Sequence, residues 1–441
     1  MGGIDLFGLS MVNMVRRHPH KIDKALRNAM VDMYQPFRRV PCFLHAPLES
    51  LLKRTKKYAV IIEFDDDQKS FNGHVNAART IIGKQPRSQI KHHYPSIHSC
   101  SATLTPAALE KLLEANPGIK KIHSDREMRA LLDVARPSVN ADLPTIQNVT
   151  GKGVTIAIVD TGIYPHKDLA GRIKGFQDLT GSKNSPYDDN GHGTHCAGDA
   201  AGDGAASNGK YKGLAPKSEV VGVKVLNKTG SGSLSNVMAG VQWCIDNQKR
   251  YDIDIMSMSL GGQAVGPTTE DPMVRIVEKA WDKGIVVLVA AGNEGPDAHT
   301  ISSPGISPKV ITVGAMDDKN TYSRRDDQVA PFSSRGPTID GVSKPDILAP
   351  GVNIVSLRSP NSYLDKRLKE SRVGTEYLAM SGTSMATPIC AGMAALILET
   401  HPELSPDQVK ERLLNTAEDW KLPADTQGKG YGDAEKAVTM P

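Results

Sequence analysis

The segment from Gly382 to Pro388 (GTSMATP), which directly precedes a long apolar run, constrains this chain most strongly. The apolar run predicts a buried helix, and the small residues before it predict a turn that places Ser384 where the helix begins. The first N–H groups of a helix lack partners within it and the helix dipole is positive there, so negative charge beside Ser384 would be stabilised. An acyl-transfer nucleophile needs these conditions. A serine at a helix start is ordinarily only an N-cap, so the other residues of the site decide whether Ser384 is a nucleophile.

Two upstream segments supply polar partners for Ser384. Residues 154–160 (VTIAIVD) are nearly all apolar and are typical of a buried parallel strand, with Asp160 at the carboxyl end, where open α/β sheets place their sites. In residues 189–198 (DNGHGTHCAG), glycines allow close backbone approach, so His192 can be presented without crowding. A metal pair of His192 with His195 is the alternative, but the sequence offers no acidic third ligand at zinc-protease spacing.

The three residues follow one another in the order Asp160, His192, Ser384, which is the order of subtilisins and not of chymotrypsins. Their local sequences resemble the subtilisin family of serine proteases. Residues 213–225, 332–337 (FSSRGP) and 345–351 (PDILAPG) are also similar to the family. The resemblance runs from about residue 135 to the end of the chain. The region before it, together with the cysteine positions, is most similar to an intracellular member of the family.

The resemblance implies a role for each site residue. Ser384 would attack the peptide carbonyl, His192 would move the proton, and Asp160 would orient the imidazole. Asn293 would donate its side-chain N–H to the oxyanion, although a turn residue is the alternative for this position. Two strands would pair with the substrate backbone, one with Gly230, Ser231 and Gly232 and the other with Ser259, Leu260 and Gly261. Leu234 would line an apolar subsite. The segment that leads to Asn293 would complete the site with Ala290, Ala291 and Gly292.

The sequence before about residue 135 predicts a separate small domain of strands and helices. Apolar spacing and turn residues predict strands at 58–64, 90–104 (one or two) and 119–123, with helices at 22–33, at 74–82 and from Pro106. From residue 58 on, the order strand–helix–strand–strand–helix–strand suits a ferredoxin-like split fold. It also resembles the propeptide-type inhibitor domain of subtilisins. That resemblance implies that residues 127–133 lie in the substrate cleft and that cleavage occurs within residues 126–137; a permanently attached domain is the alternative.

The predicted fold class is therefore α/β. A subtilisin-like, doubly wound, mostly parallel sheet is preceded by a small α+β ferredoxin-like domain of the propeptide type. Three parts are expected: an N-terminal extension (1–54), a propeptide or inhibitor-like domain (55–133) and a subtilisin-like peptidase domain (134–441).

Composition limits the partners and the compartment. The 441 residues carry a formal net charge of only +4 with mixed acids and bases, so no nucleic-acid partner is expected. Neither a secretory signal nor a membrane span is expected. The cysteine count of five is odd and lacks closely spaced pairs, which predicts no disulfide framework and favours a reducing cytoplasm. The cysteines are Cys42, Cys100, Cys196, Cys244 and Cys390.

The remaining expectations concern specificity and metals. Segment 299–305 (HTISSPG) contains no carboxylate to select a basic side chain, which predicts broad cleavage after apolar or medium-sized residues.

Catalysis is expected to need no cofactor. Structural calcium is possible, but no metal site can be assigned, because residues 201–212 depart from the calcium loop of secreted relatives. Four acids form an insertion that could bind a cation, with solvated loop acids as the preferred interpretation: Asp317, Asp318, Asp326 and Asp327.

The leading functional prediction is an intracellular serine endopeptidase that is restrained by its own N-terminal domain and acts on protein or peptide substrates. A catalytically silent peptide-binding protein on the same fold is the first alternative, since fold does not guarantee activity. An esterase of small acyl esters is the second, although two strands that pair with a substrate backbone favour peptides.

Overall fold

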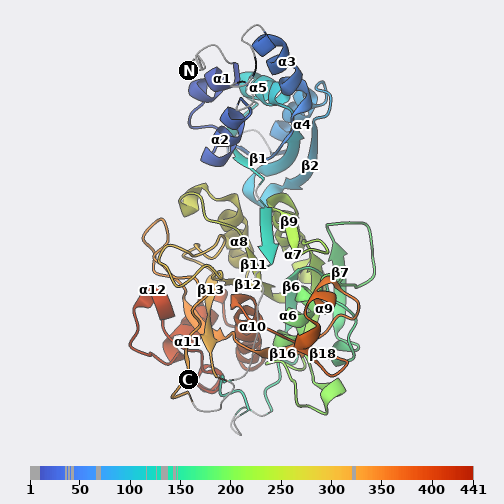
Figure 1. Ribbon diagram of the computed structural model, residues 1–441. Coiled ribbons are helices and arrows are strands. Elements are labelled where there is room, and N and C mark those ends of the chain that lie inside the picture. The colour runs from blue at the N-terminus through green and yellow to red at the C-terminus, as the bar shows by residue number, and fades with distance from the viewer. Residues whose placement is uncertain are drawn as a thin grey trace. The chain divides into compact units, whose positions relative to one another are not determined.

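A computed structural model provides the three-dimensional structure of this chain. It describes residues 10–440 except 35–36, 38–39, 41–43, 66–70, 116, 126, 131–137, 143–145, 147 and 320–323. The chain divides into two compact units, Met1–Arg126 and Glu127–Pro441 (Figure 1). The boundaries expected at residues 54/55 and 133/134 stay predictions.

The first unit is built on an antiparallel sheet in the order β2-β3-β1-β4. From residue 58 on its elements follow the predicted order, whereas α1 and α3 were not predicted. The expected start of α5 is confirmed, because the Thr105 hydroxyl accepts a hydrogen bond from Ala108 N–H at 3.3 Å. The predicted helix at 74–82 begins three residues earlier. The elements are α1 (Ser10–Arg17), α2 (Lys24–Asp32), α3 (His45–Thr55), β1 (Tyr58–Phe64), α4 (Phe71–Ile82), β2 (Gln89–Tyr94), β3 (Ser99–Leu104), α5 (Pro106–Ala115) and β4 (Ile119–Ser124).

One apolar core holds this unit together. Strand β1 is buried along nearly its whole length, and Leu109, Leu112 and Leu113 of α5 pack into the same cluster. The methionine-rich α1 and α2 add Met11, Met14 and Met30 to it. These two helices therefore belong to the same core as the sheet.

The second unit is an α/β structure around an eight-stranded sheet, as counted over the described residues. Seven strands are parallel and β14 alone is antiparallel, in the order β14-β13-β12-β10-β6-β8-β7 with β15 also pairing with β13. The strands are β6 (Thr155–Asp160), β7 (Ile173–Asp178), β8 (Glu219–Lys224), β10 (Ile253–Met258), β12 (Val286–Ala290), β13 (Ile311–Asp317), β14 (Gln328–Val329) and β15 (Ile347–Pro350). The predicted α/β fold class with a small α+β region before it is confirmed.

Helices cover both faces of this sheet, as a doubly wound fold requires. Helices α6 (His192–Ala201) and α10 (Thr383–Thr400) pack together on one face, and α7 (Leu234–Tyr251) and α8 (Pro272–Asp282) on the other. The remaining helices are α9 (Tyr363–Arg367), α11 (Pro406–Thr416), α12 (Ala424–Gln427) and α13 (Ala434–Thr439).

Helix α10 is the central element of the second unit. Among the described helices it alone is long and apolar enough to cross a membrane, but 89% of that stretch is buried inside the protein. It contacts strands of the sheet and α6. Its apolar composition is therefore explained by a position in the core.

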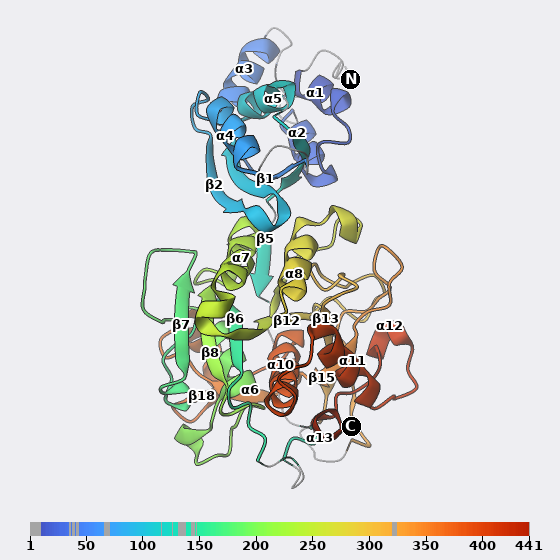
Figure 2. The ribbon, with the colours of Figure 1, turned by 180° about the vertical axis from the view of Figure 1, so that it is seen from behind.

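Two small sheets flank the large one. Strand β5 (Glu127–Ala130) lies between β9 (Ser231–Ser233) and β11 (Leu260–Gly261) and pairs antiparallel with both. Figure 2 shows β5 running between α7 and α8. A second antiparallel sheet has the order β16-β18-β17, formed by β16 (Ile354–Leu357), β18 (Tyr377–Met380) and β17 (Arg372–Val373).

Candidate active site

Asp160 and His192 meet where β6 ends and α6 begins. The Nδ1 atom of His192 lies 2.8 Å from Oδ1 of Asp160, and both side chains are fully buried. Close approach requires a glycine after the histidine, because a Cβ at Gly193 would collide with the carbonyl oxygen of Gly162. Burial by itself lowers the pKa of His192, but the facing Asp160 carboxylate and the neighbouring Cys196 together outweigh it and hold that pKa well above its ordinary value. The pair thus stabilises an imidazolium.

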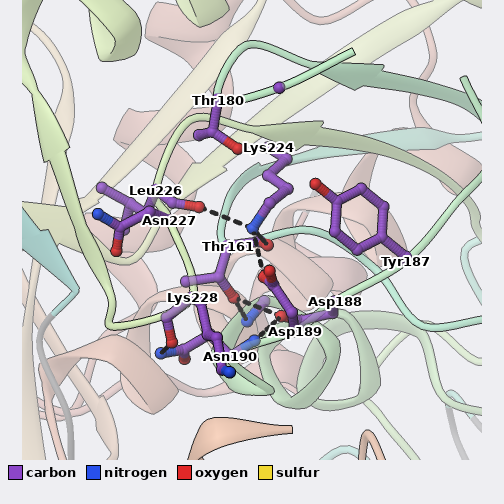
Figure 3. A network of polar contacts seen from close by, with 12 residues as sticks. Thr161, Thr180, Tyr187, Asp188, Asp189, Asn190, Lys224, Leu226, Asn227 and Lys228 are labelled. Atoms are coloured by element: carbon purple, nitrogen blue, oxygen red, sulfur yellow. Dashed lines mark hydrogen bonds and ion pairs between the residues drawn. The ribbon is translucent and has the colours of Figure 1, made fainter. Parts of the chain in front are cut away.

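Asp188, which the sequence analysis did not single out, ties this pair to the start of α6. One of its carboxylate oxygens accepts hydrogen bonds from the Thr161 hydroxyl (3.0 Å) and from the N–H groups of Asn190 (3.0 Å) and Gly191 (2.8 Å). The other accepts from the N–H (2.9 Å) and hydroxyl (2.7 Å) of Thr194. Asp188 therefore fixes both the residue after Asp160 and the helix that carries His192 (Figure 3).

A buried lysine completes the network on the strand side. The ammonium of Lys224, 1% exposed as a side chain, donates to the carbonyls of Thr161 (2.6 Å) and Leu226 (2.9 Å) and to Asp189 (2.8 Å). Figure 3 shows this lysine extending toward Thr161 and Asp189. Its charge holds the turn after β6 in place, because three oxygens converge on one cation.

Ser384 lies in the first turn of α10 and is fully buried. Its Oγ donates to the carbonyl of Ser259 at 3.3 Å, and its own carbonyl accepts from the Ser259 hydroxyl at 2.6 Å. Cys196 joins it to the histidine, since its Sγ lies 3.8 Å from His192 Nδ1 and donates to the Ser384 carbonyl at 3.5 Å. Burial raises the pKa of the Cys196 thiol to about 11. The structure therefore brings the three predicted residues into one buried cluster.

Asn293 follows β12, after Ala290, Ala291 and Gly292, and it faces the start of α10. Its side-chain oxygen accepts hydrogen bonds from the N–H of Thr383 at 3.0 Å and from the hydroxyl of the same residue at 3.1 Å. Gly292 makes the turn possible at φ +115°, where a side chain would also meet Ser302 and Ser334. Since the oxygen is held by Thr383, the amide NH₂ of Asn293 is directed elsewhere and can serve as a donor.

The expected substrate-pairing residues lie on the two strands that flank β5. Gly230 precedes β9 at φ +81°, and Ser231 and Gly232 pair with Arg129 and Met128. On the other side, Leu260 pairs with Ala130 and Gly261 with Arg129, and Ser259 comes directly before this strand. Leu234, the first residue of α7, is fully buried. The rest of the predicted tail (131–133) lies outside the described residues, as does most of the expected cleavage range.

A cavity of about 640 Å³ lies beside β11. Its lining includes Ser302 of segment 299–305, the buried Ile301 and Ile306, and Glu294 and His299. Segment 299–305 brings no carboxylate, as its sequence shows, but Glu294 enters from the neighbouring turn. The GNEG sequence at 292–295 was the signal for this acid, and only the fold brings it to the cavity.

The histidines near the candidate active site could in principle bind a metal ion. His195 does not join His192 in a pair, because its Nδ1 lies 3.0 Å from Asp199 and its Nε2 lies 3.1 Å from the carbonyls of Ile354 and Leu378. Within the described part of the chain, one group of histidine, cysteine and acidic side chains is compact enough to hold a metal, namely Asp160, His192 and Cys196. Its thiol has a raised pKa, which disfavours the thiolate that a metal requires.

The chain is similar in sequence to known proteins. The family model of the subtilase family, peptidase S8, matches residues 151–432. Serine protease AprX of Bacillus subtilis (strain 168) is 55% identical over 441 residues, which cover 98% of this chain and 99% of that protein. Subtilisin E of the same strain is 34% identical over 350 residues, 78% of this chain and 81% of its own length.

A solved structure is similar in fold. Fervidolysin from Fervidobacterium pennivorans, described as a keratinolytic enzyme related to subtilisin, matches with a TM-score of 0.68 at 24% identity. The match covers 88% of this chain, which spans 61% of the fervidolysin chain. At this identity the similarity concerns the fold alone.

Proposed function

The chain belongs to the subtilase family of serine proteases, and from this premise we propose that it hydrolyses peptide bonds through Asp160, His192 and Ser384. The observation that carries the proposal is the 2.8 Å contact between His192 Nδ1 and Asp160, which leaves Nε2 as the nitrogen that acts on the nucleophile. Cys196 contacts both His192 and Ser384, which supports their action as one unit.

The steps follow from these positions. His192 Nε2 takes the proton of the Ser384 hydroxyl as its Oγ attacks the substrate carbonyl, and the Asp160 carboxylate stabilises the resulting imidazolium. The Asn293 NH₂ and the Ser384 N–H at the start of α10 stabilise the oxyanion. His192 then gives the proton to the leaving amine, and water hydrolyses the acyl-enzyme by the same path. The chain supplies every group in this sequence, so catalysis needs no cofactor.

The substrate is proposed to be an extended segment of a protein or peptide. Strands β9 and β11 already hold β5 between them by main-chain pairing, and a substrate strand could pair in the same way. The apolar Ile301 and Ile306 in the adjacent cavity support cleavage after apolar or medium-sized residues, while Glu294 also makes a basic side chain acceptable there.

We also propose that the N-terminal region restrains the enzyme. Since β5 lies between the two strands that would hold a substrate, the full-length chain competes with its own substrates. Leu260 pairs with Ala130, and the preceding residue, Ser259, is hydrogen-bonded to Ser384. These pairings support a cleaved bond within residues 130–133, inside the range of 126–137 expected from the sequence.

A cytoplasmic location is proposed on the cysteines. Of the described cysteines, Cys100, Cys196, Cys244 and Cys390 are free and buried, which suits a reducing compartment. In the cytoplasm, restraint by β5 would protect neighbouring proteins until the chain is cleaved within residues 130–133.

The test compares wild-type protein with Ser384→Ala, purified in parallel, by intact mass and by hydrolysis of an extended peptide over time. Wild type is expected to lose roughly its first 130 residues as activity rises, while Ser384→Ala stays whole and at least roughly 10⁴-fold less active. Equal activity of the two proteins would refute the triad. Absence of activity in both would favour the silent peptide-binding alternative, and a full-length, fully active wild type would refute the restraint.

A further inference from the structure

Two buried carboxylates lie close to each other where β13 ends and β14 begins. The strands pair Met316 with Val329 and Asp317 with Gln328, and Asp318 and Asp327 are the residues directly beyond these two strand ends. The charge of Asp318 acts on Asp327. Asp318 is fully buried and Asp327 is 6% exposed. The sequence-based interpretation as solvated loop acids is wrong for these two residues.

The local charges compensate Asp327 only in part, because Arg324 opposes the like charges of Asp318 and Asp326. Neither of its carboxylate oxygens has a hydrogen-bond partner among the described residues. The nearby guanidinium of Arg324 donates to Glu418 (2.6 Å) and to the carbonyls of Ser138 (3.0 Å) and Gly432 (3.1 Å). Like charges that lie close together in a buried place repel each other, and a buried charge is ordinarily paired or bound to a metal.

A shared proton and a bound cation are two ways to relieve this repulsion. Both oxygens of the Asp327 carboxylate are buried and have no hydrogen-bond partner among the described residues, so both are available to a cation.

We propose that Asp318 and Asp327 bind a divalent, oxygen-preferring cation of the Ca²⁺ class, which holds the end of β13 to the start of β14. Two carboxylates balance a charge of +2, and carboxylate oxygens with main-chain carbonyls and water form the ligand set that Ca²⁺ prefers. The site lies outside the catalytic cluster, and the proposal does not depend on the proposed function.

The test uses full-length Ser384→Ala protein, which avoids self-digestion, after treatment with EDTA at pH 8. Calorimetric titration with CaCl₂ should give a binding isotherm, and Tm should rise by about 5 °C at a Ca²⁺ concentration a hundredfold above the Kd. Adding Asp327→Asn should abolish both effects. The matched control Asp326→Asn, which changes an exposed acid one residue away, should leave them intact.

Three results would overturn the proposal. The first is a Ca²⁺-induced rise in Tm that is equal with and without Asp327→Asn, which would locate the cation elsewhere. The second is no binding of Ca²⁺ or Mg²⁺ at millimolar concentration together with a higher Tm for Asp327→Asn, which would indicate a repulsive or proton-sharing pair. The third is equal loss of binding in Asp326→Asn, which would indicate a diffuse acidic surface. If Asp327→Asn does not fold, Asp318→Asn replaces it in the same comparison.

Discussion

The side-chain oxygen of Asn293 accepts two hydrogen bonds from Thr383, one from its main-chain N–H at 3.0 Å and one from its hydroxyl at 3.1 Å. Thr383 in turn accepts a hydrogen bond from Gly292 N–H at 3.3 Å, so the turn after β12 and the start of α10 are locked together. Thr383 is therefore a positioning residue for the proposed oxyanion donor, directly beside the proposed nucleophile.

Replacing Asn293 or Thr383 should lower kcat to different extents. Asn293→Ala is expected to reduce kcat roughly 10²–10³-fold, the loss already known for removing this donor in a subtilisin. Thr383→Val keeps the N–H bond and removes the hydroxyl, so a reduction of about 3- to 10-fold is expected with KM nearly unchanged. Thr383→Ser should retain wild-type kcat. Steady-state kinetics on one extended peptide checks all three variants, and a Thr383→Val effect confined to KM would contradict the positioning role.

The activity should rise with pH along an acidic limb set by His192. Catalysis needs the neutral imidazole, and the facing Asp160 carboxylate holds the pKa of His192 above its ordinary value of 6.5. The midpoint of the limb in kcat/KM is therefore expected above pH 6.5 in the processed enzyme. Removing the charge with Asp160→Asn should move the midpoint to lower pH and reduce kcat roughly 10⁴-fold. Profiles between about pH 5 and 10 test this, and an unmoved midpoint in Asp160→Asn would assign the limb to another group.

Asp188→Asn should weaken both stability and catalysis. An amide offers one acceptor oxygen where the carboxylate offers two, so a donor NH₂ would face either the N–H and hydroxyl of Thr194 or the donors on the other side. The free energy of unfolding is expected to fall by about 1–3 kcal/mol, with a lower kcat and little change in KM. Urea titration and kinetics measure these effects. Asp252→Asn, at an exposed acid of the same unit, is the control and should change neither quantity.

Breaking the pairing of β5 should release the enzyme early. Arg129 pairs with Ser231 on one side and with Gly261 on the other, and proline at this position removes an N–H from the ladder. Arg129→Pro is expected to shorten the lag before peptide hydrolysis begins, whereas Arg129→Ala keeps the N–H and should retain the lag. Progress curves of freshly purified protein measure the lag. An equal lag in the two variants would show that main-chain pairing of β5 does not restrain the enzyme.

Local sequence predicted most elements because their signals are local. The buried strand ending at Asp160 and the helix that starts at Pro106 both follow from apolar patterning and from turn or capping residues. Element ends were less certain, as the start of α4 at Phe71 shows. The residues that support the site were harder to predict. Thr383 lies within the quoted segment 382–388 and Asp188 directly precedes the quoted segment 189–198. Their partners Asn293 and Thr161, however, lie 90 and 27 residues away in sequence.

The sequence by itself determined the family, the α/β class and the identity of the residues proposed to react, because motif order and hydrophobic pattern are written along the chain. Only the tertiary structure decided which acidic side chains are buried and which line the cavity. Asp318 and Asp327 look like solvated loop acids in sequence, yet both are buried in the folded chain. Glu294 follows Asn293 in a turn, yet the fold brings it to the cavity beside β11. The burial of a side chain and its neighbours in space depend on which distant segments pack together, and no single motif contains that information.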